Sequence, residues 1–176
     1  MCMAWQAMRR LCYRDPKTCL PSSLAIRCAR EGEIGNEYRG MMTFDRVIAA
    51  LRSTGVQAEV LNEIDSRAIV IRVLERLGVD VTSRAPWDQA TSEGRQRPDG
   101  WELIPKYVGT NQCLMFLEGA RSIWKFSCGA DLLRVLEDCP ALEIYVCDEE
   151  ASYLLCSNHH DFVVGWGTAL PWVARC

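Results

Sequence analysis

The run Asn158-His159-His160-Asp161 is the only cluster of catalytic residue types in the sequence, and it contains both histidines of the chain. If the chain bends here, His159 and Asp161 could form a base held by a carboxylate, or half of a metal site. Without a bend, His159 and His160 point to opposite faces of a strand and cannot share one site. Spacing alone supplies no third ligand, although the acidic residues 148–150 could reach the cluster across a hairpin. This interpretation predicts a metal-dependent or histidine-based hydrolase with His159, His160 and Asp161 as catalytic candidates.

A turn is the simpler interpretation of the same cluster. Asparagine and aspartate side chains hydrogen-bond to nearby backbone groups, so Asn158 and Asp161 can shape a turn while one histidine packs locally. Cys156 lies three residues before His159, but the apolar run that contains it is typical of a buried strand rather than of a nucleophile. The favoured interpretation therefore assigns no catalytic, metal-binding or cofactor-binding residue.

Contact with a protein partner is the function that we favour from the sequence. Trp87 lies in a long polar stretch and Trp166 in a Gly-Trp-Gly run, where we expect a tight turn, and both are candidates for exposed aromatic contacts. The acidic bend at 148–150 could meet a cationic partner. The predicted contact residues are Trp87, Asp148, Glu149, Glu150, Asn158 and Trp166.

Charge indicates what kind of partner this could be. The chain has a net charge of −3, and residues 1–40 carry seven Lys or Arg against four Asp or Glu. Residues 41–176 carry thirteen Lys or Arg against nineteen Asp or Glu, a balance of −6. Nucleic-acid phosphates require a cationic face. The main body therefore favours a basic protein partner and argues against nucleic acid.

The sequence also favours a cytoplasmic protein. No apolar run approaches the roughly 20 residues that span a bilayer, so we expect no membrane insertion. Charged residues between positions 9 and 15 interrupt the apolar region that a signal peptide would need. No two of the ten cysteines have the C-x2-C or C-x4-C spacing of a zinc site, and we expect them to be reduced and largely buried.

The chain divides near its first forty residues. Residues 1–41 lack sustained apolar periodicity, and we interpret them as a flexible basic extension upstream of a native start at Met41 or Met42. A native basic tail is the alternative. Residues 42–176 are predicted to form a single α+β domain, in which residues 82–100 are a long loop.

Within this domain the sequence predicts two helices, a set of strands and further helices. Gly55 is placed to end the first helix. The second helix is capped by Asn62 and ends at Gly78, and its apolar face is wide enough for burial on more than one side. The expected strands are 101–104, 112–117, 122–126, 142–146, 153–156 and 162–164, with helices at 129–138 and 168–175. Short turns between strands predict a largely antiparallel sheet of about five to six strands. We expect the N-terminal helices and the one inserted helix to pack on one face of it.

Residues 101–172 resemble a family of small bacterial proteins of unknown function. The resemblance depends on residues 123–126, 143–146 and 153–156, on the Asn-His-His-Asp string, and on Gly165 followed by Trp172. Similar small acidic α+β domains often serve as immunity proteins beside bacterial toxins. The resemblance implies an architecture and a protein-binding role, and it assigns no catalytic residue.

Overall fold

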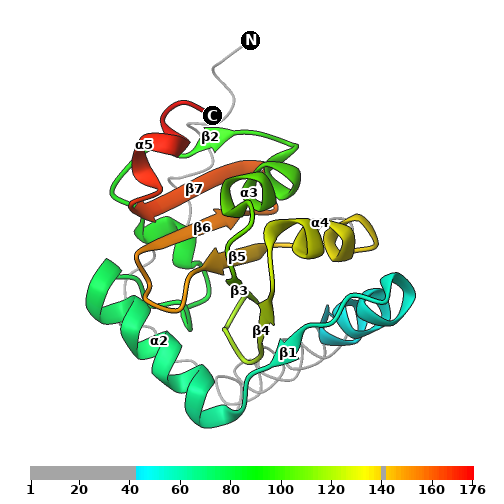
Figure 1. Ribbon diagram of the computed structural model, residues 1–176. Coiled ribbons are helices and arrows are strands. Elements are labelled where there is room, and N and C mark those ends of the chain that lie inside the picture. Colours follow the sequence, from blue (N-terminus) through cyan, green and yellow to red (C-terminus); the bar gives the residue numbers. More distant parts are fainter. Residues whose placement is uncertain (1–42, 140–141) are drawn as a thin grey trace, which may run out of the picture. The chain divides into compact units, whose positions relative to one another are not determined.

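The computed structural model describes residues 43–139 and 142–176, which belong to one compact unit (Figure 1). The interpretation of residues 1–41 as an extension lies outside the described residues. Residues 43–54 are helical, and Gly55 ends this helix with a φ of 69°, as the sequence predicted. None of the helices in the described ranges is long and apolar enough to cross a membrane.

The centre of the described unit is a seven-stranded sheet in the order β1-β4-β3-β5-β6-β7-β2, and all neighbouring strands are antiparallel. The strands are β1 (Glu59–Val60), β2 (Arg95–Gln96), β3 (Cys113–Leu117), β4 (Ile123–Phe126), β5 (Ile144–Cys147), β6 (Tyr153–Ser157) and β7 (Phe162–Gly167). The predicted α+β class is confirmed. The sheet has more strands than expected because the short strands β1 and β2 pair at its two edges.

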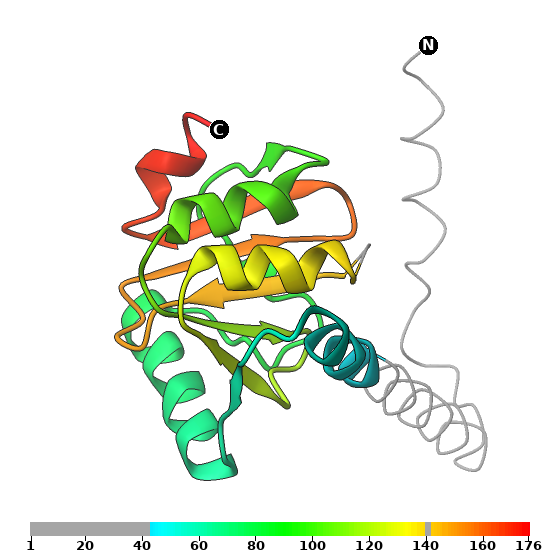
Figure 2. The same cartoon turned by 45° about the vertical axis from the view of Figure 1, so that its right-hand side comes forward.

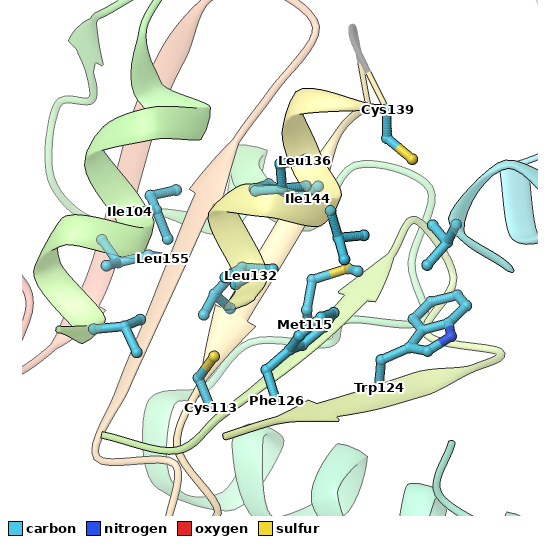
Figure 3. Close-up of a cluster of buried hydrophobic side chains, with 14 of the residues drawn as sticks. Ile104, Cys113, Met115, Trp124, Phe126, Leu132, Leu136, Cys139, Ile144 and Leu155 are labelled. Atoms are coloured by element: carbon cyan, nitrogen blue, oxygen red, sulfur yellow. The ribbon is translucent and has the colours of Figure 1, made fainter. Parts of the chain in front are cut away.

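Helices cover both faces of the sheet, whereas the sequence analysis expected helices on one face. The helices with described bounds are α2 (Glu63–Leu77), α3 (Gly100–Val108), α4 (Gly129–Glu137) and α5 (Leu170–Val173). One core cluster joins α3, α4, α5 and residues 43–54 to one face of the sheet, and a second joins α2 to the other (Figures 1 and 2). Figure 3 shows the first cluster, with Leu132 and Leu136 of α4 beside Met115 of β3. Strands β3, β5 and β6 are nearly continuous apolar runs because both of their faces are buried.

Helix α2 forms where the sequence predicted it. The Asn62 side chain accepts a hydrogen bond from the backbone N–H of Asp65, and Gly78 ends the helix in the left-handed conformation. The prediction that this helix is buried on more than one side is wrong. Only Ser66, Ile69 and Val73 are buried, so α2 packs along one narrow stripe and exposes its opposite face.

The predicted strand 101–104 is wrong, because these residues lie in α3. Ile104, Pro105 and Val108 are buried together, a spacing that fits one face of a helix. The apolar run is short, and Pro105 interrupts it, so its period could not be recognised from the sequence. Helix α3 approaches α4 closely, since a Cβ at Gly129 would lie 2.0 Å from the Pro105 carbonyl oxygen.

Two other segments are more regular than predicted. The expected loop 82–100 contains a 3₁₀ helix, η2 (Pro86–Gln89), and then strand β2, which pairs with β7. Strand β7 does not stop at Val164, and the predicted turn at 165–167 is instead the end of this strand. Gly165 and Trp166 pair with Leu155 and Leu154 of β6.

Candidate functional site

The run Asn158-His159-His160-Asp161 is a tight turn between β6 and β7. Asn158 is 6% exposed, and its Oδ1 accepts hydrogen bonds from the backbone N–H groups of His160 and Phe162, both at 3.0 Å. Asp161 has a φ of 62°, a left-handed conformation that aspartate tolerates better than most residues. Asn158 and Asp161 therefore shape the turn, as the simpler interpretation predicted.

His159 is held by a carboxylate that the sequence analysis did not select. Its Nδ1 lies 2.7 Å from Oε2 of Glu143, and the histidine side chain is 60% exposed while that of the glutamate is 11% exposed. The other oxygen, Oε1, accepts a hydrogen bond of 2.6 Å from the hydroxyl of Tyr145. Burial raises the pKa of Tyr145 well above its ordinary value, so this hydroxyl stays protonated and remains a donor. Tyr145, Glu143 and His159 thus form a hydrogen-bonded chain that ends at the surface.

The acidic residues expected across the hairpin lie at the opposite end of β5 and β6. The register pairs Ile144 with Ser157, which brings Glu143 to the Asn158–Asp161 turn. The same register places Asp148, Glu149 and Glu150 in the β5–β6 turn, where Asp148 accepts hydrogen bonds from Ser152. The hypothesis that residues 148–150 complete a site with the histidines is therefore wrong.

His160 has a different environment from His159. The two imidazole rings have centroids 4.0 Å apart, and the ring of Trp87 meets both edge-on, at 5.4 Å from His160 and 6.0 Å from His159. Trp87 is half-buried and packs against the second core cluster, so the η2 segment folds back onto the domain. Trp87, His159 and His160 therefore come together at the Asn158–Asp161 turn.

Two other candidates are in the core. Trp166 is buried on β7, and the expectation that it is an exposed contact residue is wrong. Cys156 is fully buried, and burial raises the pKa of its thiol well above the ordinary value. A nucleophilic thiolate at this position is therefore unsupported.

A cavity of about 270 Å³ lies beside the turn. Its lining residues are Pro98, Trp101, Leu136, Cys139, Leu142, Ile144, Ser157, Asn158, His159 and Asp161. The thiol of Cys139 donates to the carbonyl oxygen of Arg46, and burial raises its pKa, so it is a neutral thiol. A larger hollow of about 490 Å³ lies beside β1 and β4, but its lining contains no histidine or cysteine. Of these two cavities, the one beside the Asn158–Asp161 turn therefore contains the histidine and the cysteine.

Metal-ligating side chains do not gather in the described part of the chain. No group of three or more His, Cys, Asp or Glu residues among residues 43–139 and 142–176 is arranged to hold a metal ion. Glu143 engages His159 as a hydrogen-bond acceptor instead. The histidine-based form of the hydrolase hypothesis therefore has more geometric support than the metal-dependent form.

Comparison with protein-family models, with curated proteins and with solved structures finds no match for this chain. The resemblance of residues 101–172 to small immunity-like bacterial proteins stays a prediction.

Proposed function

We propose that this protein is a protein-binding module that binds a basic partner through the exposed face of α2. The observation that carries the proposal is a row of apolar side chains on this face, here called the α2 stripe and consisting of Ile64, Ala68, Ile71 and Leu74. Ile64 is 82% exposed, Ile71 45% and Leu74 49%. Positions 64, 68 and 71 follow the spacing of one helix face, opposite the buried Ile69 and Val73.

The α2 stripe is unusual for this molecule. Five large hydrophobic residues are exposed in the described part of the chain. Three of them belong to the α2 stripe, and the other two are Val60 of β1 and Leu170 of α5. Burying one such side chain in an interface removes apolar surface worth about 1.5–3 kcal/mol from water. Exposed apolar patches of this kind are typical of interaction sites. A helix lying along α2 would bury these side chains together.

Hydrogen bonds and ion pairs position α2 so that the stripe stays outward. Arg72 and Arg76 donate to the backbone carbonyls of Glu149 and Glu150, and Arg76 also lies 3.7 Å from the carboxylate of Glu150. Lys125 of β4 pairs with Glu149. The predicted contact residues Asp148, Glu149 and Glu150 thus engage their own chain, and Glu149 and Glu150 hold Arg72 and Arg76 of α2 against the domain.

Charge complementarity supports a basic partner at the α2 stripe. The remaining charged side chains of α2 are Glu63, Asp65, Arg67 and Glu75, three acidic and one basic. A partner helix with apolar residues on one side and lysine or arginine along its borders matches this surface. The immunity-like role that the resemblance suggests is one biological form of this proposal.

A pair of designed peptides tests the proposal. The probes are a helical Leu/Lys peptide and a Leu/Glu peptide of the same length, titrated into ¹⁵N-labelled protein. The Leu/Lys peptide is expected to shift the amide signals of Ile64, Ala68 and Ile71 in a saturable way, and the Leu/Glu peptide to bind at least about tenfold more weakly. Replacing Ile64 and Ile71 together by serine should weaken binding by at least about tenfold, because two anchors lose their buried apolar surface.

Leu170→Ser is the matched control, because Leu170 is also an exposed large hydrophobic residue but lies on α5. An equal loss of affinity in this variant would contradict the proposal, as would equal binding of the two peptides. Sedimentation of the protein alone supplies a further check. If the chain dimerises and the Ile64/Ile71 variant abolishes the dimer, a second copy occupies the α2 stripe and the basic partner is rejected.

A further inference from the structure

We propose that the cavity beside the Asn158–Asp161 turn hydrolyses small uncharged carboxylic esters, with His159 as the general base. This inference is independent of the α2 stripe, which lies on the other face of the sheet. It gives the histidine-based hypothesis a specific geometry, in which Glu143 is the positioning carboxylate and Asn158 binds the substrate carbonyl.

Glu143 orients the ring of His159. The Glu143 carboxylate lies beside Nδ1 of His159 and can only accept a hydrogen bond. This favours the imidazole tautomer in which Nδ1 carries the proton. The lone pair is then on Nε2, the ring nitrogen with no hydrogen-bond partner among the described residues. The Tyr145 hydroxyl fixes Glu143 from the other side. A base oriented by a buried carboxylate is the arrangement found in hydrolytic sites of many unrelated folds.

Asn158 supplies a hydrogen-bond donor in the same cavity. Asn158 is more than nine-tenths buried, and both hydrogen bonds that fix its side chain are accepted by Oδ1. Its Nδ2 donates to no acceptor within the described part of the protein. Nδ2 is not one of the fully buried atoms without a partner, which in the described residues are Ser92 Oγ, Trp124 Nε1 and Trp166 Nε1, so this unused donor is accessible and can donate to a ligand in the cavity. A carbonyl oxygen suits this donor, and the hydrogen bond strengthens as the oxygen gains negative charge in the transition state.

The cavity's lining and volume limit the size and polarity of the substrate. Trp101, Leu136, Leu142 and Ile144 supply apolar walls, and no lysine or arginine lines the cavity. A volume of about 270 Å³ lies just below the usual range for drug-sized ligands, so a short acyl chain fits better than a long one. These walls favour an uncharged ester over a carboxylate or a phosphate ester.

Water is the nucleophile that the geometry supports. Ser157 lines the cavity, but its hydroxyl makes no hydrogen bond with His159, and the Cys139 thiol is neutral and bonded to the Arg46 carbonyl oxygen. His159 Nε2 takes a proton from a water molecule while the water oxygen adds to the ester carbonyl carbon. The tetrahedral intermediate then expels the alcohol, which receives the proton from Nε2, and the carboxylic acid remains. One water is consumed, and His159 returns to its starting state.

Hydrolysis of p-nitrophenyl butyrate by the full chain tests the proposal, and His160 supplies a control at the adjacent position. We expect saturable turnover and a loss of about a hundredfold in kcat/KM for His159→Gln, a typical contribution of a general base. His160→Gln should keep the rate within about twofold, because His160 has no carboxylate partner among the described residues. Glu143→Gln should lower kcat about tenfold with KM unchanged, as expected for a residue that positions the base rather than binding substrate.

Three results would overturn the proposal. The first is a rate that does not saturate and equals that of free imidazole at the same concentration. The second is an equal loss of activity in His160→Gln and His159→Gln, with thermal unfolding showing that both variants are folded. The third is a burst of one nitrophenol per chain that Ser157→Ala abolishes, since this would make Ser157 the nucleophile in place of water.

Discussion

Oε2 of Glu143 lies 2.7 Å from Nδ1 of His159, although 16 residues separate the two along the chain. The antiparallel register of β5 and β6 produces this contact. Ile144 at the start of β5 pairs with Ser157 at the end of β6, so Glu143 just before β5 and His159 just after β6 lie at the same end of the two strands. His160 follows His159 directly but contacts Trp87 rather than a carboxylate. Two adjacent histidines therefore differ in whether an acidic side chain fixes their tautomer, and each can serve as a reference for the other.

The tautomer of His159 is the most direct prediction from this contact. At a pH of about 9, where an ordinary imidazole is neutral, ¹⁵N ring shifts should show His159 largely protonated on Nδ1, because that hydrogen is donated to Glu143. Glu143→Gln removes the negative charge of the acceptor and should lower this preference several-fold. The ring shifts of His160 should not change. An unaltered His159 tautomer in the variant would show that the contact does not orient the ring.

Asn158 is predicted to stabilise the turn through its side-chain oxygen. Asn158→Ala leaves the backbone N–H groups of His160 and Phe162 without their acceptor in a partly buried turn. The expected loss is about 1–3 kcal/mol in the free energy of unfolding, measured by urea denaturation. Asn158→Asp keeps the acceptor and should recover most of this loss. If the alanine and aspartate variants are equally destabilised, the two hydrogen bonds are not the cause.

Local signals explain what could be predicted from the sequence. Both ends of helix α2 could be predicted, because the residues that cap it, Asn62 and Gly78, bond to backbone groups within one helical turn. Its buried side could not be predicted, since Ile64, Ile71 and Leu74 are as apolar as Ile69 and Val73. Which apolar side faces the sheet depends on how the helix packs against the rest of the domain. In α2, hydrogen bonds from two arginines to the carbonyls of Glu149 and Glu150 go with the observed orientation.

The central contact of the candidate site depends on register. The register pairs Cys147 with Leu154 and Ile144 with Ser157, so counting outward from a turn at 149–152 places Glu143 beside the histidines. Residues 148–150 form a denser acidic run than Glu143 and so look like the better candidates in the sequence, but they occupy the β5–β6 turn at the far end of the strands. The Asn158–Asp161 turn was recognisable because its asparagine and aspartate act on their own backbone.

Gly129 is predicted to be indispensable for the contact between α3 and α4. A Cβ at this position would lie 2.0 Å from the Pro105 carbonyl oxygen and 3.1 Å from the backbone nitrogen of Gly109. Backbone atoms cannot move aside like a flexible side chain, so Gly129→Ala should cost about 3 kcal/mol or more in the free energy of unfolding. Gly55→Ala is the control, because its Cβ would meet nothing within 4 Å and only its φ of 69° is strained. We expect the control to cost about 1 kcal/mol, and equal losses in the two variants would refute the close approach of the helices.

Asp80 gives a prediction for the pH dependence of stability. The Thr82 hydroxyl and the Thr82 backbone N–H both donate to its Oδ1, at 2.6 and 2.9 Å, and the side-chain hydrogen bond is the larger cause of a lowered pKa. A carboxyl whose pKa is lower in the folded state stabilises the protein above its unfolded pKa of about 3.9, and this stabilisation is lost as the pH falls through the folded pKa. Thr82→Val removes the hydroxyl, so the stability difference between wild type and variant should be present at pH 7 and shrink below about pH 4. Urea denaturation across this range measures it. In an Asp80→Asn background the effect of Thr82→Val should not vary with pH, and a pH dependence that persists there would assign it to another group.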